Sequence, residues 1–289
     1  NEIITALQPR CGGRYVDGTL GAGGHAFGIL EASSPDGEVL GLDRDPAALA
    51  VAAERLKPFG VRAHLMRSSY LDMTAAAAKI GWDAADGIVL DLGLSSLQID
   101  DASRGFAFSH DGPLDMRLDP TLTVKASDLV NRLSEKELGD LFFANAQEFR
   151  GRRIAKRICE SRRDGRITTT GRLTRLICEA MGVDGDSRKS KGHPATRACM
   201  ALRIEGNAEL ENLKALLDAA PNLLKPGGRI GIIAFHSEED KIVKTDFRKR
   251  GNEGLYQVLT KKPVVAGEEE RAANPRSRSA KLRVAMRVP

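Results

Sequence analysis

Residues 15–25 read YVDGTLGAGGH, a pattern with few structural solutions. Tyr15 and Val16 suit a strand, which stops at the carboxylate of Asp17. Four glycines follow within residues 18–24, and glycine is needed where a backbone turns sharply or approaches a ligand closely. Residues 26–32 then have helical character. This order predicts a nucleotide-type cofactor site at the carboxyl end of a first parallel strand.

Residues 21–26, GAGGHA, also fit the G-x-G-x-x-G/A pattern of dinucleotide-binding folds. The position of Asp17 favours a different cofactor. Its carboxylate would face a pyrophosphate unfavourably, whereas it suits the ammonium and sulfonium of S-adenosylmethionine. A second acid, Asp43, stands where a second strand should end and can accept hydrogen bonds from both ribose hydroxyls. A structural turn beside a surface acid is the alternative, which the paired acids make less favourable.

The composition indicates an intracellular globular protein. At 289 residues the chain suits one large domain or one domain with an insert. No apolar run reaches the roughly 18 residues of a membrane span. The four cysteines form no C-x-x-C pair and are expected to be reduced thiols. The histidines show no metal-binding spacing, so no metal is expected. The expected compartment is the cytoplasm, or an organellar matrix or stroma in a eukaryote.

Positive charge is concentrated in one segment. Residues 150–203 hold 15 Lys/Arg against 5 Asp/Glu, a local net charge of +10, and the rest of the chain has 29 basic and 34 acidic residues. Solvated helix faces are the simple explanation. The functional explanation is a surface that binds phosphates.

The order of elements predicts an α/β fold with a helical insert. Strands ending near residues 16, 43, 66 and 91 alternate with helices, which indicates a parallel, helix-covered sheet. Residues 104–203 show amphipathic helices and no convincing strand. A helix over 208–224 and an apolar strand over 230–235 then resume the alternation. Residues 255–260 and 280–286 can close the sheet as an antiparallel pair.

Two loops carry groups suited to an acceptor base. Residues 91–98, DLGLSSLQ, follow the fourth strand, where Asp91 can contact the methionine ammonium. Ser95, Ser96 and Gln98 supply donors and acceptors, although a helix-capping serine pair explains them equally well. In residues 104–117, Phe106 and Phe108 can stack on a flipped base. Anchoring of that loop in the core is the alternative.

Several motifs together resemble one family. They are DGTLGAGGH (17–25), LDRDP (42–46), DLGLSS (91–96), RGF (104–106), DGPLDMR (111–117), HPATR (193–197), FHS with ED (235–240) and NPRSRSAKLR (274–283). The chain resembles the MraW-type 16S ribosomal RNA cytosine-N4 methyltransferases over nearly its whole length. It departs from them in lacking the usual His-x-Pro-Val start, in residues 145–148, and at Glu238.

The resemblance implies a Rossmann-like class I methyltransferase with a mostly parallel seven-stranded sheet, formed by residues 1–103 and 206–289. Residues 104–205 would be an inserted helical domain that recognises RNA. The reaction implied is methyl transfer from S-adenosylmethionine to the N4 amino group of a decoding-centre cytidine. The partner would be 16S-type ribosomal RNA or the small ribosomal subunit, with no membrane involved. The oligomeric state is left open, with a homodimer as one option.

The expected site residues fall into three groups. The candidates for holding or accepting the amino proton are Asp91, Ser95, Ser96 and Asp115. The expected cofactor contacts are Asp17, Gly21, Gly23, Gly24, His25, Asp43, Tyr70, Asp91 and Gln98. The expected substrate contacts are Phe106, Phe108, Arg117, Arg152, Arg153, His193, Arg197, His236, Arg276 and Arg278.

Two other functional classes compete with this one. An NAD(P)-dependent oxidoreductase would use the glycine loop but leaves the Asp91 motif and the basic segment unexplained. The other is a non-catalytic RNA-binding or ribosome-assembly protein that retains a cofactor pocket. Methylation at cytosine C5 would need a cysteine nucleophile, and no cysteine lies in these loops.

Overall fold

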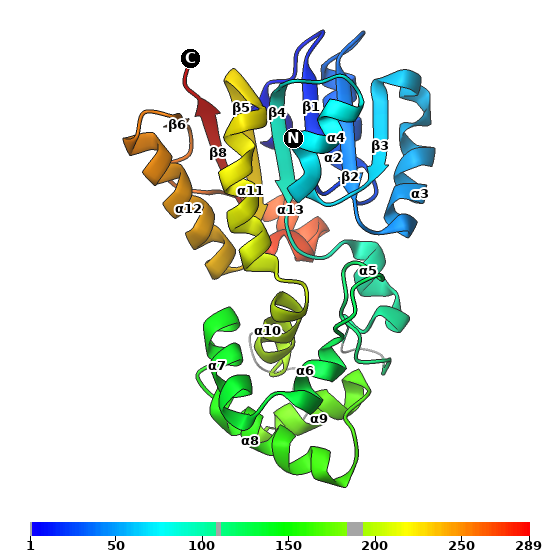
Figure 1. The fold of residues 1–289 in the computed structure, drawn as a ribbon, viewed down its shortest axis with the longest axis vertical. Helices are drawn as coiled ribbons and strands as arrows, with labels where there is room; N and C mark the ends of the chain where they lie inside the picture. Colours follow the sequence, from blue (N-terminus) through cyan, green and yellow to red (C-terminus); the bar gives the residue numbers. More distant parts are fainter. Residues whose placement is uncertain (1, 108–110, 184–192) are drawn as a thin grey trace. The chain divides into compact units, whose positions relative to one another are not determined.

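The structure is a computed structural model that describes residues 2–107, 111–183 and 193–289 (Figure 1). It divides into two compact units. Unit 1 comprises Asn1–Gly93 and Leu210–Pro289, and unit 2 comprises Leu94–Glu209. Residues 94–103 and 206–209 thus join the helical unit rather than the sheet-containing one. Leu94 illustrates the reason, because its side chain packs against the hydrophobic core of unit 2.

The sheet of unit 1 has the strand order β3-β2-β1-β4-β5-β8-β6, with β7 paired to β8. Strands β1 to β5 are parallel to one another, whereas β8 is antiparallel to β5, β6 and β7. The strands are β1 (Arg14–Asp17), β2 (Glu38–Asp43), β3 (Ala63–Arg67), β4 (Ala85–Asp91), β5 (Leu224–Ala234), β6 (Tyr256–Val258), β7 (Val264–Val265) and β8 (Lys281–Arg287). The predicted Rossmann-like sheet and its antiparallel closure are confirmed, and β7 adds a short eighth strand.

Helices cover both faces of this sheet. Successive strand residues point to opposite sides, and here apolar side chains are buried on both sides. Tyr15 and Val89 join one buried cluster, and Val16 and Leu90 join the other. The helices are α1 (Glu2–Leu7), α2 (Gly24–Ala32), α3 (Pro46–Leu56), α4 (Met73–Lys79), α11 (Glu209–Leu223), α12 (Ser237–Asn252) and α13 (Glu268–Ala273), with 3-10 turns η1 (Lys57–Arg62), η2 (Tyr70–Asp72) and η5 (Pro275–Ser279). Short caps set their starts. Asp45, for example, accepts the Ala47 amide and Pro46 takes the first helical position.

Unit 2 is helical around its own core. Its elements are α5 (Ser96–Asp100), η3 (Ala102–Arg104), α6 (Ala126–Arg132), α7 (Glu135–Ala146), α8 (Gly151–Ser161), η4 (Arg162–Asp164), α9 (Thr170–Met181) and α10 (Thr196–Gly206). The amphipathic character predicted for this region is seen in α8, where Ile154, Ala155 and Ile158 are buried. Thr169, whose side chain accepts the Arg172 amide, caps α9, and Thr170 lies inside the helix.

Candidate active site

Three carboxylates lie at one edge of the parallel sheet. Asp17 ends β1, Asp43 ends β2 and Asp91 ends β4. These strands are adjacent and parallel in the order β2-β1-β4, so their carboxyl ends lie along the same edge. Crevices outside the carboxyl ends of parallel strands are where open α/β sheets bind their ligands. The carboxylates of β1, β2 and β4 therefore lie where a ligand site of this kind of sheet is expected.

The glycine loop connects β1 to α2, and two of its glycines have clear structural roles. A Cβ on Gly18 would lie 3.1 Å from Cβ of Tyr70 and 3.3 Å from a methyl of Leu90. Gly23 has φ of 76° and occupies the N-cap position of α2. That left-handed conformation costs an L-residue with a side chain about 1–2 kcal/mol. The sequence pattern is thus explained by close approach at Gly18 and by backbone conformation at Gly23.

Asp17 is fully buried. Its Oδ1 accepts the Thr19 amide at 3.2 Å, and its Oδ2 has no hydrogen-bond partner in the part of the chain that the structure describes. Burial raises the pKa of Asp17 to about 6, and the charges of Asp91 and Asp43 push in the same direction, whereas His25 opposes it. An unpaired buried carboxylate oxygen is costly unless a donor or a cation meets it. Asp17 therefore favours a cationic ligand.

Asp43 is bonded differently. Its Oδ2 accepts the Gly21 amide at 2.8 Å and its Oδ1 accepts the Asp45 amide at 2.9 Å. Burial raises the pKa of Asp43 in spite of these two bonds. An ionised carboxylate offers about four acceptor positions. The two amides fix the orientation of the Asp43 carboxylate and leave it with capacity to accept further hydroxyl groups.

Asp91 is held by Thr19 and His25. The Asp91 amide donates to Oγ1 of Thr19 at 2.6 Å, and Oδ2 of Asp91 lies 3.3 Å from Nε2 of His25. Oδ1 is buried without a hydrogen-bond partner among the described residues. Burial alone would lower the pKa of His25, but the bond to Asp91 and the charge of Asp17 raise it overall. Thr19 was not among the predicted site residues, although it stands inside the quoted motif.

Tyr70 begins the 3-10 turn η2, which follows β3. The Ser69 side chain caps this turn by accepting the Leu71 amide. The guanidinium of Arg44 lies 5.9 Å from the centre of the Tyr70 ring and donates to Oγ of Ser69 at 2.6 Å. Together with the contact to Gly18, these interactions place Tyr70 against the glycine loop of unit 1.

In unit 2, Ser95 and Gln98 form a capping box at the start of α5. Oγ of Ser95 accepts the Gln98 amide, and Oε1 of Gln98 accepts the Ser95 amide. Ser96 is exposed, and the side chain of Gln98 is buried. The capping alternative weighed for the serine pair therefore describes Ser95 in this structure.

Asp115 and Arg117 bind each other. Nε and one terminal nitrogen of Arg117 donate to the two oxygens of Asp115 at 2.7 and 2.8 Å, and Nζ of Lys125 lies 3.5 Å from Oδ2. Although partial burial opposes it, the pKa of Asp115 is lowered by these partners. A carboxylate so paired is a weak proton acceptor. Phe106 also has a structural position, since its ring is 8% exposed within the core of unit 2.

The remaining predicted substrate residues differ in exposure. Arg152 and Arg153 are exposed on α8. Arg197 is exposed on α10, near the carbonyl of Gln147. Nδ1 of His193 accepts the Ala195 amide at the start of that helix. Phe108 lies outside the described residues.

Three further predicted residues belong to unit 1. His236 is the N-cap of α12: its Nδ1 accepts the Glu239 amide and its Nε2 lies 3.1 Å from Oε1 of Glu239. The ring is thereby held as a helix cap. Arg276 and Arg278 are exposed on η5.

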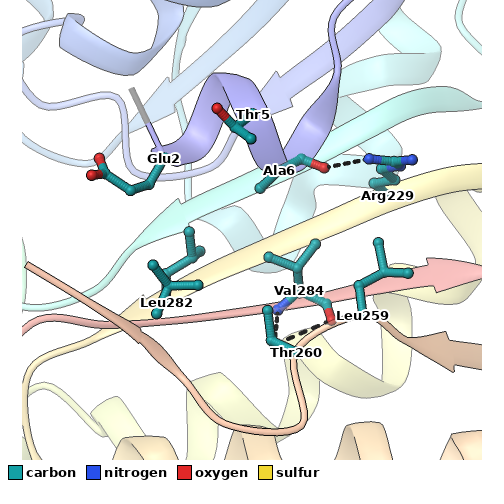
Figure 2. Close-up of a pocket in the computed structure, with 9 residues that line it drawn as sticks. Glu2, Thr5, Ala6, Arg229, Leu259, Thr260, Leu282 and Val284 are labelled. Atoms are coloured by element: carbon teal, nitrogen blue, oxygen red, sulfur yellow. Dashed lines mark hydrogen bonds between the residues drawn. The ribbon is translucent and has the colours of Figure 1, made fainter.

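A cavity of about 360 Å³ lies elsewhere in unit 1. Figure 2 shows Glu2, Thr5 and Ala6 of α1 on one side, opposite Leu282 and Val284 of β8. Arg229 donates to the carbonyl of Ala6 at its rim. Neither Asp17 nor Asp91 lines it, so it is separate from the candidate site.

Within residues 2–107, 111–183 and 193–289, no group of three or more His, Cys, Asp or Glu side chains is placed to hold a metal ion. The same ranges include no helix that is long and apolar enough to span a membrane.

Comparison with known proteins gives a consistent result. Residues 1–288 match the model of the MraW methylase family. The chain is 47% identical to ribosomal RNA small subunit methyltransferase H of Geotalea uraniireducens over 302 residues, covering 99% of this chain and 96% of that protein. Proteins of the same name from Maridesulfovibrio salexigens and Geobacter sulfurreducens are each 46% identical, with 100% and 99% of this chain covered and 94% and 96% of theirs.

Proposed function

Because this chain belongs to the MraW methylase family, we propose that it transfers a methyl group from S-adenosylmethionine to the N4 amino group of a decoding-centre cytidine in 16S ribosomal RNA. The observation that carries the proposal is the row of carboxylates at the ends of β1, β2 and β4. The full-length similarity to proteins named ribosomal RNA small subunit methyltransferase H supports the substrate. Membership of a methylase family favours this function over an NAD(P)-dependent oxidoreductase.

The residues of unit 1 fit S-adenosylmethionine. Oδ2 of Asp17 and Oδ1 of Asp91 are buried oxygens without partners among the described residues, and a cationic ammonium or sulfonium would stabilise them. Asp43 would accept hydroxyl hydrogen bonds from the ribose. Gly21, Gly23, Gly24, His25 and Tyr70 are proposed as the other contacts within unit 1, and Gln98 of unit 2 stays a prediction. When bound, the cofactor supplies a methyl group made electrophilic by its positive sulfur.

The protein's contribution is to position the acceptor and to hold its proton. The lone pair of the cytosine amino group is delocalised into the ring, so alignment with the methyl group is the main catalytic effect. Of the proposed proton acceptors, Asp115 is already paired with Arg117 and Ser95 caps α5. Asp91 has a buried oxygen without a hydrogen-bond partner among the described residues. Asp91 is therefore the best-supported candidate, ahead of the exposed Ser96.

Unit 2 is proposed to recognise the RNA, through the arginines of α8 and α10, with Arg276 and Arg278 of unit 1 as further phosphate contacts. We also propose that the protein acts in the cytoplasm, without a membrane. A homodimer stays a proposal, and the sedimentation coefficient is the measurement that decides it.

The test is incubation with labelled S-adenosylmethionine and small subunits that lack the modification, followed by nucleoside mass spectrometry. We expect label in N4-methylcytidine and a loss of at least about 100-fold in rate for Asp91→Ala, as for other lost positioning or proton-accepting groups. Recovery of 5-methylcytidine instead would refute the reaction. Undiminished function of Asp91→Ala in subunit assembly, without methylation, would favour a non-catalytic assembly factor.

A further inference from the structure

Unit 2 exposes two phenylalanine rings that touch each other. Phe143 is 55% exposed and Phe149 is 78% exposed. Their ring centres are 5.8 Å apart with an angle of 67° between the planes. Leaving a phenylalanine side chain in water forgoes a gain of about 1.5–3 kcal/mol on burial. Two exposed rings in contact form an apolar patch, unlike the singly scattered exposed apolar residues that are normal on a protein surface.

The rings are held outward by the backbone between α7 and α8. Gln147 ends α7 in a left-handed conformation, with φ of 50°. The Glu148 amide then donates to the carbonyl of Phe142, and the buried Glu148 carboxylate accepts the Arg150 amide. Gly151 donates to the Glu148 carbonyl. A turn bonded this thoroughly fixes Phe149 in an outward position.

The helix that follows carries uncompensated positive charge. Residues 150–157, RGRRIAKR, hold five basic residues and no acid. Arg157 pairs with Glu179, whereas Arg152, Arg153 and Lys156 are exposed and form no ion pair within the described part of the chain. Asp140 is exposed on α7, one turn before Phe143, so the excess positive charge lies on the α8 side of the rings.

Exposed rings beside free guanidinium groups fit single-stranded nucleic acid. An unpaired base stacks on an aromatic ring whatever its identity, while its phosphates bind arginine. An RNA duplex keeps its bases stacked inside and offers none to such a ring. An acidic protein segment would meet the arginines but gain little from two adjoining phenylalanine rings.

We propose that the Phe143–Phe149 pair and the free face of α8 bind a single-stranded segment of RNA, with one base stacked on Phe149 and the adjoining phosphates on Arg152 and Arg153. This inference rests on the proposed function and adds Phe143 and Phe149 to the RNA contacts proposed on α8. Neither phenylalanine is in the loops from which the substrate residues were predicted.

The test measures binding of the full chain to a fluorescent oligouridylate about 12 nucleotides long, a length within the range of single-strand binding sites. We expect Phe149→Ala to weaken binding by about 5- to 150-fold, the effect of losing one stacked base, and Phe149→Trp to retain it. Val61→Ala, at a residue 88% exposed in unit 1, is the matched control and should change nothing. Thermal unfolding of Phe149→Ala should match the wild type because the ring is exposed.

Salt dependence separates the two contacts. Arg153→Gln should reduce the slope of log K against log salt concentration by about 0.7, the value for one phosphate contact on a single strand. Phe149→Ala should leave that slope unchanged, because stacking releases no counterions. An equal loss of affinity by Phe149→Ala on an RNA duplex would overturn the proposal.

The outcomes distinguish failure of this inference from failure of the proposed function. If the wild-type chain methylates small subunits while Phe149→Ala binds the oligouridylate normally, this inference is wrong and the proposed function stands. If the wild-type chain neither binds the RNA nor methylates subunits, both are wrong. A change in sedimentation coefficient on Phe149→Ala would assign the rings to contact with a second copy of the chain and overturn the proposal.

Discussion

Hydrogen bonding gives the strand-end carboxylates different roles. Asp43 accepts two backbone amides and is held in one orientation. Asp17 accepts one, from Thr19, and has an oxygen without a partner among the described residues. Burial raises the pKa of Asp17 to about 6, which is near neutral pH. Its ionisation should therefore govern cofactor binding.

Cofactor binding should weaken as Asp17 is protonated. The Kd for S-adenosylmethionine is expected to be flat above pH about 6 and to rise by up to about tenfold per pH unit below it, because the neutral acid no longer attracts the cation. Calorimetric titration of the wild type and Asp17→Asn checks this. The variant should bind more weakly at pH 7.5 and lack the rise. A rise that persists in Asp17→Asn would assign the titration to another group, with His25 first.

The raised pKa of Asp17 makes the stability of the cofactor-free protein change with pH in the opposite direction to cofactor affinity. A carboxyl whose pKa rises from 3.8 to about 6 on folding stabilises the fold below pH about 3.8, and this stability is lost as the pH rises through about 6. Two pKa units correspond to about 3 kcal/mol. Urea unfolding at several pH values should show this loss in the wild type relative to Asp17→Asn.

The acids of the site were predictable because each stands directly after an apolar strand, at spacings typical of parallel sheets. Their partners were not. That Thr19 accepts the Asp91 amide depends on how β1 and β4 align, which no local pattern encodes. The pairing of Asp115 with Arg117 was likewise hidden, since both were read only as groups free to meet substrate.

At the scale of elements, helices with wide apolar stripes or clear caps were predicted closely. Helix α11, Glu209–Leu223, closely matches its predicted range of 208–224, because Leu213, Leu216 and Leu217 belong to its apolar stripe. Helix α12 was missed, since its sequence is largely charged and Val243 and Phe247 are its only buried large apolar side chains. An ion pair adds to the packing of these two side chains in attaching α12 to the sheet. Asp240 binds Arg283 of β8 at 2.6 and 3.2 Å.

Breaking that attachment should be costly. The side chain of Arg283 is 7% exposed, so Asp240→Ala would leave a buried guanidinium without its main acceptor. We expect a loss of about 3–5 kcal/mol in the free energy of unfolding. Glu54→Ala, which removes a pair with Lys57 whose side chains are 77% and 80% exposed, is the control and should cost under about 0.5 kcal/mol. Equal losses in urea unfolding would contradict the ionic attachment.

At the scale of the whole molecule, the chain builds two separate cores. The clusters on the two faces of the sheet contain residues of unit 1 alone, and the helical cluster contains residues of unit 2 alone. The sequence predicted this division from the loss of strand pattern after residue 103. The predicted boundaries fall inside the helical unit, because α5 is short and lacks a periodic stripe and was therefore left with the sheet-containing unit.

Cofactor should therefore protect one unit. At a concentration about 100 times Kd, S-adenosylmethionine stabilises its binding unit by about 2.7 kcal/mol. We expect slower hydrogen exchange at the amides of Gly21 and Asp91 and across β1 and β4, with exchange in α7 and α9 unchanged. Mass spectrometry of exchanged peptides measures both. Equal slowing in the helical unit would show that the two cores unfold together.

The strand pairing also sets an order of events during synthesis. Leu90 of β4 pairs with Ile232 of β5, and the whole helical unit lies between them in the chain. At 5–20 residues per second, the ribosome takes roughly 7 to 26 s to make residues 92–223. During that time β4 has an open hydrogen-bonding edge, while the helical unit emerges complete. Until β5 is synthesised, the nascent sheet therefore exposes unpaired backbone groups along β4, and such an edge is a binding site for chaperones.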